Sequence, residues 1–469
     1  MIKFFPLVEK LDRGGVYFSR NVSPTKFTRG GSFVSLKKGV FPCVLVMAIT
    51  LIVAGSVQAA ITLKVWDQWT GTADKQAVDM MDANFEKMHP DVKIERSAMP
   101  AATIADKIRP ALLSGTGPDV IYPEVGITFL GPLAKAGLVM DLTEVWEKRG
   151  WNQKLVEGAK AIPTFGGRTF GVGHEIEYVP IYYNKNIFNK LGVTPPKSIS
   201  ELEDICEKAL AAGYIPIAWS ARDWWTKTNL ATAILWSYLG KEKAEEAMFR
   251  GGSWDMPEVR EALQKAFVEW PKRNFYPPNF VALGYDEGNM FFYQQKAVMH
   301  PEGNWMIGGY VENVKDFEIG VFLWPRPKEG EPSCTIFFCG SGYVISNSTK
   351  YPELAVDYVD YLMASKEAAK LWYEVAATIP PLKLSEEDIA EWNIHYLVKE
   401  ATKALSSEEI QFVPGLSMGT PAEAFEFLKT GVAEILTGQI TVDEFVKEWE
   451  KLWQKGREEG LTYDTFKLE

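Results

Sequence analysis

The sequence predicts an α/β protein of two or three domains, built on mostly parallel sheets. At 469 residues the chain is too long for one ordinary domain. Short alternating or apolar runs, typical of strands, are followed by longer stretches with helical spacing, and this order repeats along the chain. The composition, 46% hydrophobic and 24% charged without repeats, is that of a globular protein. Strands that alternate with helices form βαβ units, which indicates the fold class.

The first half of the chain shows this alternation most clearly. Gly115-Thr-Gly-Pro-Asp119 is a turn that leads from a helix into a short buried strand. The expected elements are strands at residues 61–66, 92–96 and 120–122 and helices at 73–89 and 102–114.

The second half continues in the same way. A β-type run ends at an Asn-Lys turn, and the short helix that follows stops at Gly192, just before Pro195 and Pro196. The expected elements are strands at residues 179–183 and 215–218 and helices at 199–212, 229–239, 258–270, 352–363 and 441–455.

Residues 1–59 predict a signal peptide with a long N-terminal extension. Lys37-Lys38 precedes an uncharged, mostly apolar run, and Val57-Gln58-Ala59 is a small-x-small cleavage site. We therefore expect a mature chain that starts near Ala60 and a periplasmic or cell-surface protein. A retained membrane anchor is the alternative, because the apolar run approaches the roughly 18 residues that an anchor needs. A misplaced start codon is the simplest explanation of the extension.

The charge of the chain bears on its partners. The net charge is −11, and removal of the basic residues 1–59 takes it to about −17. Such an acidic chain argues against nucleic acid or anionic lipid as a partner.

The sequence predicts no metal site, cofactor or disulfide framework. Gly115-Thr-Gly-Pro118 breaks the pattern of a phosphate-binding loop. Cys334 and Cys339 are five residues apart in an extended run, which puts them on opposite faces. The remaining cysteine of the mature chain and the histidines show no ligand spacing: Cys206, His89, His174, His300 and His395.

Residues 171–196 carry the most informative pattern. Glu175 and Glu177 stand just before a β-type run, without a nucleophile or metal ligand nearby, and such carboxylates suit the binding of hydroxyl groups. The stretch resembles the mid-chain crossover of extracytoplasmic solute-binding proteins of ABC transporters, the carbohydrate-binding family typified by maltodextrin-binding protein. In that family an acid, five residues and Tyr-Asn-Lys carry the chain from one lobe to the other.

Other blocks resemble the same family in the same order, from about residue 61 to 456. Residues 115–120 are similar to its Gly-x-x-Pro-Asp-Val turn, and 292–305 to its Phe-x-x-Gly-Lys-Ala-Ala-Met…Gly-x-Trp, with Gln295 in place of Gly. Residues 340–346 and 350–362 resemble its Gly-Gly-x-Ile strand and the following helix. The departures at Gln295 and at Gly173-His174 bear on ligand choice.

The resemblance implies a two-lobed, type II periplasmic-binding-protein-like fold with three crossovers. The expected N-terminal lobe holds residues 60–176 and 320–386, and the expected C-terminal lobe holds residues 177–319 and 387–469. The ligand is expected between the lobes, at the carboxyl ends of the strands.

A sugar site needs carboxylates or amides for hydroxyl groups and flat aromatic rings for the C–H faces. Trp305 lies where the family places a stacking Trp, Glu177 matches the crossover acid, and Phe425 falls near the last aromatic contact. Each also has a structural alternative, as core or as a salt bridge. The expected ligand contacts are Trp69, Glu124, Glu175, Glu177, Trp224, Trp225, Trp305 and Phe425.

The adjacent Trp224 and Trp225 are expected on a loop after the strand 215–218, at the edge where ligands bind. Asp223 is expected either to join them or to brace Arg222. Trp69 follows the first strand and is expected to face the ligand, whereas Trp66 points the other way and is expected to be buried.

The function that this implies is a monomeric binding component of an ABC importer, which delivers a sugar or oligosaccharide to a membrane permease. Two alternatives stay open. The same fold with acidic and aromatic contacts also suits a polyamine or another cation. The more remote alternative is a glycoside hydrolase that uses Glu175 and Glu177 as its pair of carboxylates.

Overall fold

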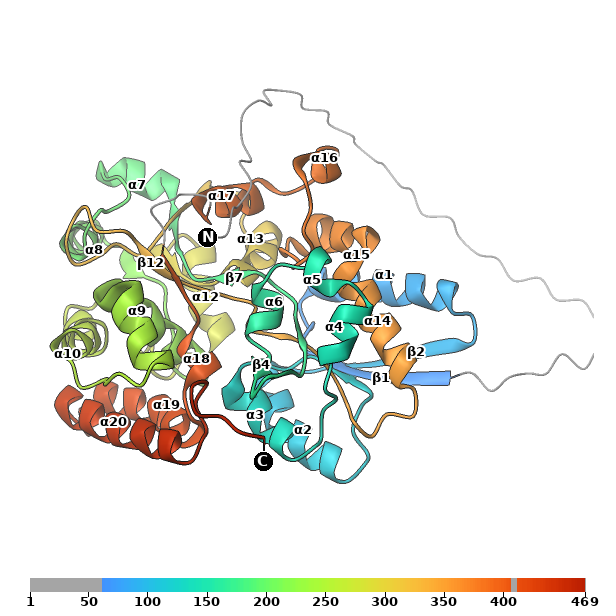
Figure 1. The fold of residues 1–469 in the computed structure, drawn as a ribbon. Coiled ribbons are helices and arrows are strands. Elements are labelled where there is room, and N and C mark those ends of the chain that lie inside the picture. Colours follow the sequence, from blue (N-terminus) through green and yellow to red (C-terminus); the bar gives the residue numbers. More distant parts are fainter. Residues whose placement is uncertain (1–60, 406–410, 469) are drawn as a thin grey trace, which may run out of the picture. The chain divides into compact units, whose positions relative to one another are not determined.

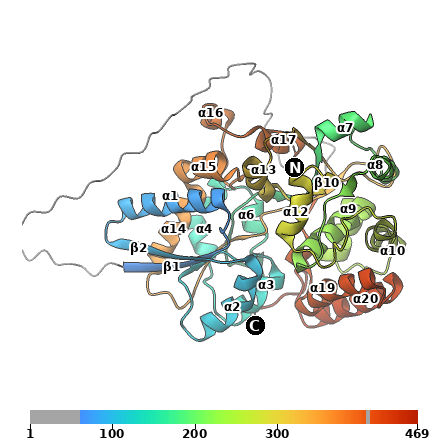
Figure 2. The ribbon, with the colours of Figure 1, turned by 180° about the vertical axis from the view of Figure 1, so that it is seen from behind.

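The computed structural model describes residues 61–405 and 411–468. The expected signal peptide and the expected start of the mature chain fall on residues outside this part. None of the helices that the structure describes combines the length and the apolar character that a membrane crossing requires. Figures 1 and 2 draw the described elements from two opposite sides.

One sheet has five strands in the order β2-β1-β3-β13-β6. β1 (Ile61–Asp67) pairs in parallel with β2 (Val92–Ala98) and with β3 (Val120–Ile121). β13 (Gly342–Ile345) is antiparallel to β3 and to β6 (Val172–Gly173). Four strands therefore run in one direction and β13 runs against them. The three strands predicted between residues 61 and 122 are confirmed.

A second sheet has four strands in the order β11-β8-β10-β9. β8 (Ile181–Asn184) is antiparallel to β10 (Ala297–Pro301) and to β11 (Ile319–Phe322), and β10 is parallel to β9 (Ile215–Ile217). Here too a single strand, β8, runs against the others. A lobe boundary at residue 320 would have placed β11 with the first sheet. That placement is wrong for this strand, because all four of its residues pair with β8.

A small three-stranded sheet contains the strands that connect the two larger sheets in sequence. In it β12 (Cys334–Phe338) is antiparallel to β7 (Glu177–Tyr178) and parallel to β14 (Gln411–Val413). β7 comes between the strands β6 and β8, and β12 comes between β11 and β13. The chain therefore passes from the first sheet to the second through β7 and returns through β12. Glu177, the expected crossover acid, lies on the first of these passages.

The short helix after β8 shows how local residues set its boundaries. The side chain of Asn184 accepts a hydrogen bond from the backbone N–H of Ile187 at 3.0 Å, so it caps the first turn of α7 (Lys185–Leu191). Gly192 ends the helix with a φ of 64°, a left-handed conformation that glycine adopts without steric cost. The Asn-Lys turn and the glycine stop predicted from the sequence are both confirmed.

The other helices cover the sheets. α1 packs together with α14 and α15 near the five-stranded sheet, and α8, α12 and α17 contact strands of the four-stranded sheet (Figures 1 and 2). Their bounds are α1 (Thr72–Met88), α2 (Ala101–Leu113), α3 (Ile127–Lys135), α4 (Thr143–Lys148), α5 (Trp151–Lys154), α6 (Gly158–Ala161), α8 (Ile199–Ala211), α9 (Trp224–Phe249), α10 (Pro257–Gln264), α11 (Trp270–Lys272), α12 (Tyr285–Tyr293), α13 (Ile307–Asn313), α14 (Pro352–Ala364), α15 (Lys366–Leu371), α16 (Glu386–Ile389), α17 (Tyr396–Leu405), α18 (Leu416–Gly419), α19 (Ala422–Thr437) and α20 (Val442–Glu458).

Helix α9 begins earlier than the sequence predicts. Trp224 and Trp225 were expected on a loop, but they form its first turn, so that expectation is wrong. Asp223 takes an extended conformation at the N-cap position, and its carbonyl accepts a hydrogen bond from the hydroxyl of Thr226 at 2.9 Å. The chain therefore turns into the helix directly before the two tryptophans.

Much of the aromatic content lies in the core. The ring of Trp254 lies 4.6 Å from that of Trp449 and 5.2 Å from that of Trp453, where α9, α10 and α20 pack together. All three described cysteines are free and buried.

Candidate functional site

The expected site residues gather at the carboxyl ends of strands. Glu124 follows β3, Glu175 follows β6, and Trp224 and Trp225 follow β9 after a short loop. Trp305 follows β10. Because parallel strands end at the same edge of a sheet, these positions are where an open α/β sheet offers side chains to a ligand.

Trp305 is held by the residues just before it. Its indole Nε1 donates to Oε2 of Glu302 at 3.1 Å and lies 3.3 Å from Oη of Tyr285. One face of the indole lies on Gly303, since a Cβ atom added at this glycine would come within 2.2 Å of the ring carbons. Only glycine leaves room for the ring there. The indole is half-buried, so it is not a core residue in the way that Trp254 is.

Asn304, between the glycine and the tryptophan, joins this loop to the crossover strand. Its Nδ2 donates to the carbonyl oxygen of Ile176 at 2.9 Å and to Oε1 of Glu175 at 3.2 Å. Its Oδ1 accepts from the backbone N–H of Tyr178 at 2.8 Å. The side chain is fully buried, so these bonds are shielded from water. Asn304 thereby fixes the backbone on both sides of Glu177.

Glu175 and Glu177 are both buried, at 3% and 7% exposure. Burial raises the pKa of each carboxyl group well above its usual value. The carboxylate of Asp74 raises the pKa of Glu175 further, and those of Glu175 and Glu124 raise that of Glu177. The backbone N–H of Ser341 donates to Glu177 at 3.4 Å and is the one group that lowers its pKa. Within the described part of the chain, no basic side chain lowers the pKa of either group.

Glu124 lies close to this pair. Its backbone forms an isolated β-bridge with Ser341, the residue that donates to Glu177. Burial raises the pKa of Glu124 to about 8, although a hydrogen bond from Ser417 and the charge of Lys429 lower it. Its Oε2 atom is buried and has no hydrogen-bond partner among the described residues. A buried acceptor without a donor is costly, and a ligand hydroxyl would satisfy it.

Two groups of aromatic rings lie beside these carboxylates. In the first, the ring of Trp225 is 4.1 Å from that of Tyr285 in a T-shaped contact, and Tyr285 in turn contacts Trp305. The backbone N–H of Tyr285 donates to Asp223 at 2.8 Å. Asp223 therefore supports this group and does not brace Arg222, which pairs with Glu287 instead.

The second group contains Trp224 and Phe425. The Trp224 ring lies 5.4 Å from that of Phe425 and 5.9 Å from that of Phe129 on α3. The ammonium of Lys429 lies over both Trp224 and Phe425, at 5.4 and 5.5 Å from the ring centroids. Phe425 is 1% exposed, which leaves little of its ring for a ligand in this state.

Trp69 and Trp66 have the reverse of the expected burial. Trp69 is 5% exposed, whereas Trp66 is only half-buried, so the expectation for this pair is wrong. Trp69 is buried because a cluster of aromatic rings surrounds it. The indole of Trp69 lies 5.0 Å from that of Trp372 and 5.4 Å from the ring of His174, and its Nε1 donates to Tyr343 at 3.3 Å. Whether Trp69 contacts a ligand stays a prediction.

His174 sits in the same cluster and is neutral. Its Nδ1 shares a hydrogen bond of 2.9 Å with the hydroxyl of Tyr122, and burial lowers its pKa to about 3. The described residues contain no group of three or more side chains that could hold a metal ion.

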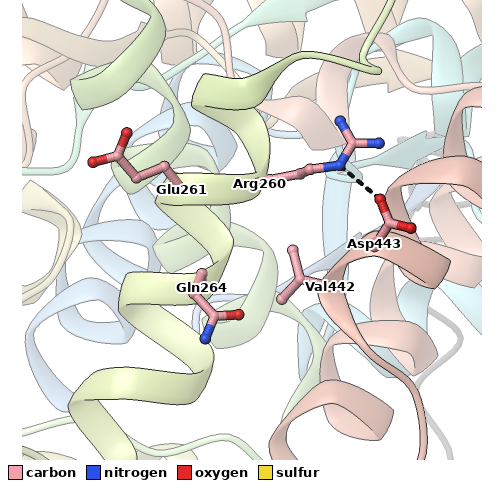
Figure 3. A pocket seen from close by; sticks show the side chains of 5 residues that line it. All are labelled: Arg260, Glu261, Gln264, Val442 and Asp443. Atoms are coloured by element: carbon pink, nitrogen blue, oxygen red, sulfur yellow. Dashed lines mark hydrogen bonds and ion pairs between the residues drawn. The ribbon is translucent and has the colours of Figure 1, made fainter.

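Two hollows of the surface lie away from these residues. A shallow pocket of about 310 Å³ between α10 and α20 is lined by Arg260, Glu261, Gln264, Val442 and Asp443 (Figure 3). There Arg260 Nε donates to Asp443 at 2.9 Å, which is an ion pair between two helices. A second pocket, of about 480 Å³, is lined by residues 70–83 at the start of α1. Neither contains any of the eight expected ligand contacts.

The structure thus brings Glu124, Glu175 and Glu177 together. It also joins Trp225 and Trp305 into one group, because Tyr285 contacts both of them. Sequence reasoning missed several members of the site, namely Phe129, Tyr285, Glu302, Asn304 and Lys429. Glu302 and Asn304 had a usable signal, since they are a carboxylate and an amide within the family-like block at residues 292–305. The others come from helices and become neighbours only through packing.

Comparisons with known proteins identify the family of the chain. Residues 68–369 match the family described as bacterial extracellular solute-binding protein, which is more than half of the chain. An uncharacterized ABC transporter extracellular-binding protein of Pyrococcus horikoshii is 23% identical over 370 residues, 77% of this chain and 80% of that protein. The multiple sugar-binding protein of Streptococcus mutans is 26% identical over 323 residues, 65% of this chain and 72% of that protein.

Solved structures show the same fold. A protein from a study of xylan utilization by the thermophilic bacterium Caldanaerobius polysaccharolyticus superposes with a TM-score of 0.76 at 24% identity, over 83% of this chain and 99% of that one. The two-lobed type II fold is therefore confirmed. The chain belongs to the bacterial extracellular solute-binding proteins of ABC transporters, a family of periplasmic or cell-surface binding proteins.

Proposed function

We propose that this protein binds a neutral mono- or oligosaccharide between its two lobes and delivers it unchanged to an ABC permease. The observation that carries the proposal is the pairing of carboxyl groups, two of them buried, with half-buried aromatic rings that follow strands of the second sheet. Glu124, Glu175 and Glu177 offer acceptors to hydroxyl groups, and Trp225 and Trp305 offer flat apolar faces. The name of the Streptococcus mutans relative supports the same ligand class.

The burial of these carboxylates suggests how a ligand would reach them. Glu175 accepts a hydrogen bond from Asn304, in the loop after β10, and Glu177 accepts one from the backbone N–H of Ser341. We propose that the lobes separate about β7 and β12 to admit the sugar and close when it is bound. The lobes are proposed to be residues 60–176 with 320–386 and residues 177–319 with 387–469, with β11 moved to the second lobe.

A polyamine is the rival ligand, because carboxylates and aromatic rings also bind cations. The structure gives a reason to prefer the sugar. Burial raises the pKa of Glu124 to about 8, which favours the neutral form of this carboxyl group. A protonated carboxyl group both donates and accepts hydrogen bonds, which suits hydroxyl groups, but it offers no charge to an ammonium.

A thermal-shift panel tests the proposal. We would compare xylotriose, N,N′-diacetylchitobiose, maltotriose, raffinose and free monosaccharides with putrescine and spermidine. A bound ligand at 100 times its dissociation constant stabilises the fold by about 2.7 kcal/mol. We expect a shift with at least one sugar, nearly independent of salt. A response to polyamines alone that weakens in high salt would transfer the proposal to the cationic ligand.

A further inference from the structure

Glu302 receives three hydrogen bonds on one oxygen atom. Its Oε2 accepts from Nε1 of Trp305 at 3.1 Å, from Oη of Tyr285 at 3.2 Å and from the backbone N–H of Gly303 at 3.1 Å. The residue is 5% exposed and follows β10 directly. Two of its three donors are aromatic side chains of the proposed site.

The groups that face Glu302 are phenols. Tyr285 and Tyr293 on α12, Tyr182 on β8 and Tyr310 on α13 all have pKa values raised by burial and, less strongly, by the charge of Glu302. His300, two residues before it, is neutral because burial lowers its pKa to about 3. Within the described residues no cation lowers the pKa of Glu302, which burial raises to about 7. The carboxylate is therefore held by hydrogen bonds and not by an ion pair.

We propose that Glu302 is the positioning residue of the aromatic group, and that its carboxylate sets the orientation in which Trp305 and Tyr285 meet a ligand. This inference rests on the proposed function. Gly303 supports one face of the indole, and Glu302 fixes its edge, so rotation of the half-buried ring is blocked in two directions. Through the ring contact of Tyr285 with Trp225, the same carboxylate also supports the third aromatic ring.

A preorganised ring explains why a carboxylate is placed there. Stacking on a sugar depends on the orientation of the ring, and a side chain that is already ordered loses less entropy when the ligand binds. Hydrogen bonds to a charged acceptor are about twice as strong as neutral ones, so a carboxylate orders the indole better than a neutral acceptor does. Glu302 itself need not touch the sugar.

The test uses the full chain and needs no ligand. Tryptophan replaced by 5-fluorotryptophan gives a ¹⁹F NMR signal for each indole, and Trp305→Phe identifies the signal of Trp305. We expect this signal to shift with pH, with a midpoint near the pKa of about 7 of Glu302, and to lose that shift in Glu302→Gln. A Trp305 signal that is independent of pH, or that titrates equally in Glu302→Gln, would overturn the proposal.

The chain offers a matched control. Trp270 donates its Nε1 to Glu203 at 2.8 Å, an indole–carboxylate pair at the helices α8 and α11. Glu203→Gln should move the signal of Trp270 and leave that of Trp305 in place. It should also leave sugar affinity unchanged.

Calorimetry with xylotriose and N,N′-diacetylchitobiose gives the second readout. We expect Glu302→Ala to weaken binding about tenfold or more, and Glu302→Gln, which keeps an acceptor of the same shape but loses the charge, to weaken it by less than Glu302→Ala does. Wild-type affinity in Glu302→Ala would show that the carboxylate does not position the rings for binding. If neither sugar binds wild-type protein, the proposed ligand class fails for these sugars, and the NMR titration alone decides whether Glu302 orients Trp305.

Discussion

Truncation of Trp305 to Ala separates a ligand contact from a core residue. One face of the indole lies on Gly303 and its edge donates to Glu302, and we propose that a sugar stacks on the other face. A sugar stacked there would bury about 60–100 Å² of apolar surface, worth roughly 1.5–2.5 kcal/mol at ~25 cal/mol per Å². The loss of this contact predicts about a 10- to 70-fold weaker affinity.

The same substitution has a smaller effect on folding. A fully buried tryptophan costs about 3–5 kcal/mol when it is truncated. Trp305 is half-buried, so we expect a cost of roughly 1–3 kcal/mol, which includes the hydrogen bond to Glu302. Trp254→Ala, at a ring with no exposed surface, should show the opposite balance, with a large loss of stability and little direct effect on binding.

Two measurements on each variant decide between these outcomes. Isothermal titration calorimetry with the best sugar of the panel gives the affinity, and urea unfolding gives the stability. An affinity of Trp305→Ala within twofold of wild type, together with a fall of more than about 3 kcal/mol in the free energy of unfolding, would refute the reasoning. It would also remove the best-supported aromatic contact of the proposed site.

Three further predictions concern the same region. Gly303→Ala should weaken sugar binding without removing any functional group, because its Cβ would displace the indole, and calorimetry with unchanged affinity would contradict this. Asn304→Ala should lower the free energy of unfolding by about 2–4 kcal/mol, since three buried hydrogen bonds are lost, whereas the exposed Asn313→Ala should change urea unfolding by less than about 0.5 kcal/mol. The pKa values of Glu124 and Glu302 are raised on folding to about 8 and about 7, so the stability that protonation of these groups gives is fully present below about pH 4.5 and is lost as the pH rises through 7 and 8. Thermal unfolding should therefore occur at a lower temperature at pH 8.5 than at pH 5.5, and a flatter profile is expected for Glu124→Gln; equal slopes in both proteins would contradict the assignment.

The sequence by itself determined the elements and the family. The alternation of strand and helix patterns, the cap at Asn184 and the stop at Gly192 depend on residues within a few positions of each other, and these local signals hold in the structure. The ordered blocks from residue 61 onward indicated the two-lobed fold. Glu124 lies just after a predicted strand, Glu175 just before the predicted strand at 179–183, and Trp305 at the end of a block that resembles the family, and these positions were enough to expect all three near the ligand.

Only the tertiary structure decided which of these side chains meet and what they meet. Asn304 reaches Glu175 across 129 residues of sequence, and nothing local to either residue announces that bond. Trp224 and Trp225 are adjacent in the chain yet join different ring groups, because neighbouring positions on a helix face different directions. The periodicity of β1 could not show that Trp69 would be buried, since the rings that cover it, Trp372 among them, come from distant parts of the chain. Burial and hydrogen bonding of a side chain depend on neighbours brought close by the fold, and a local pattern contains no information about them.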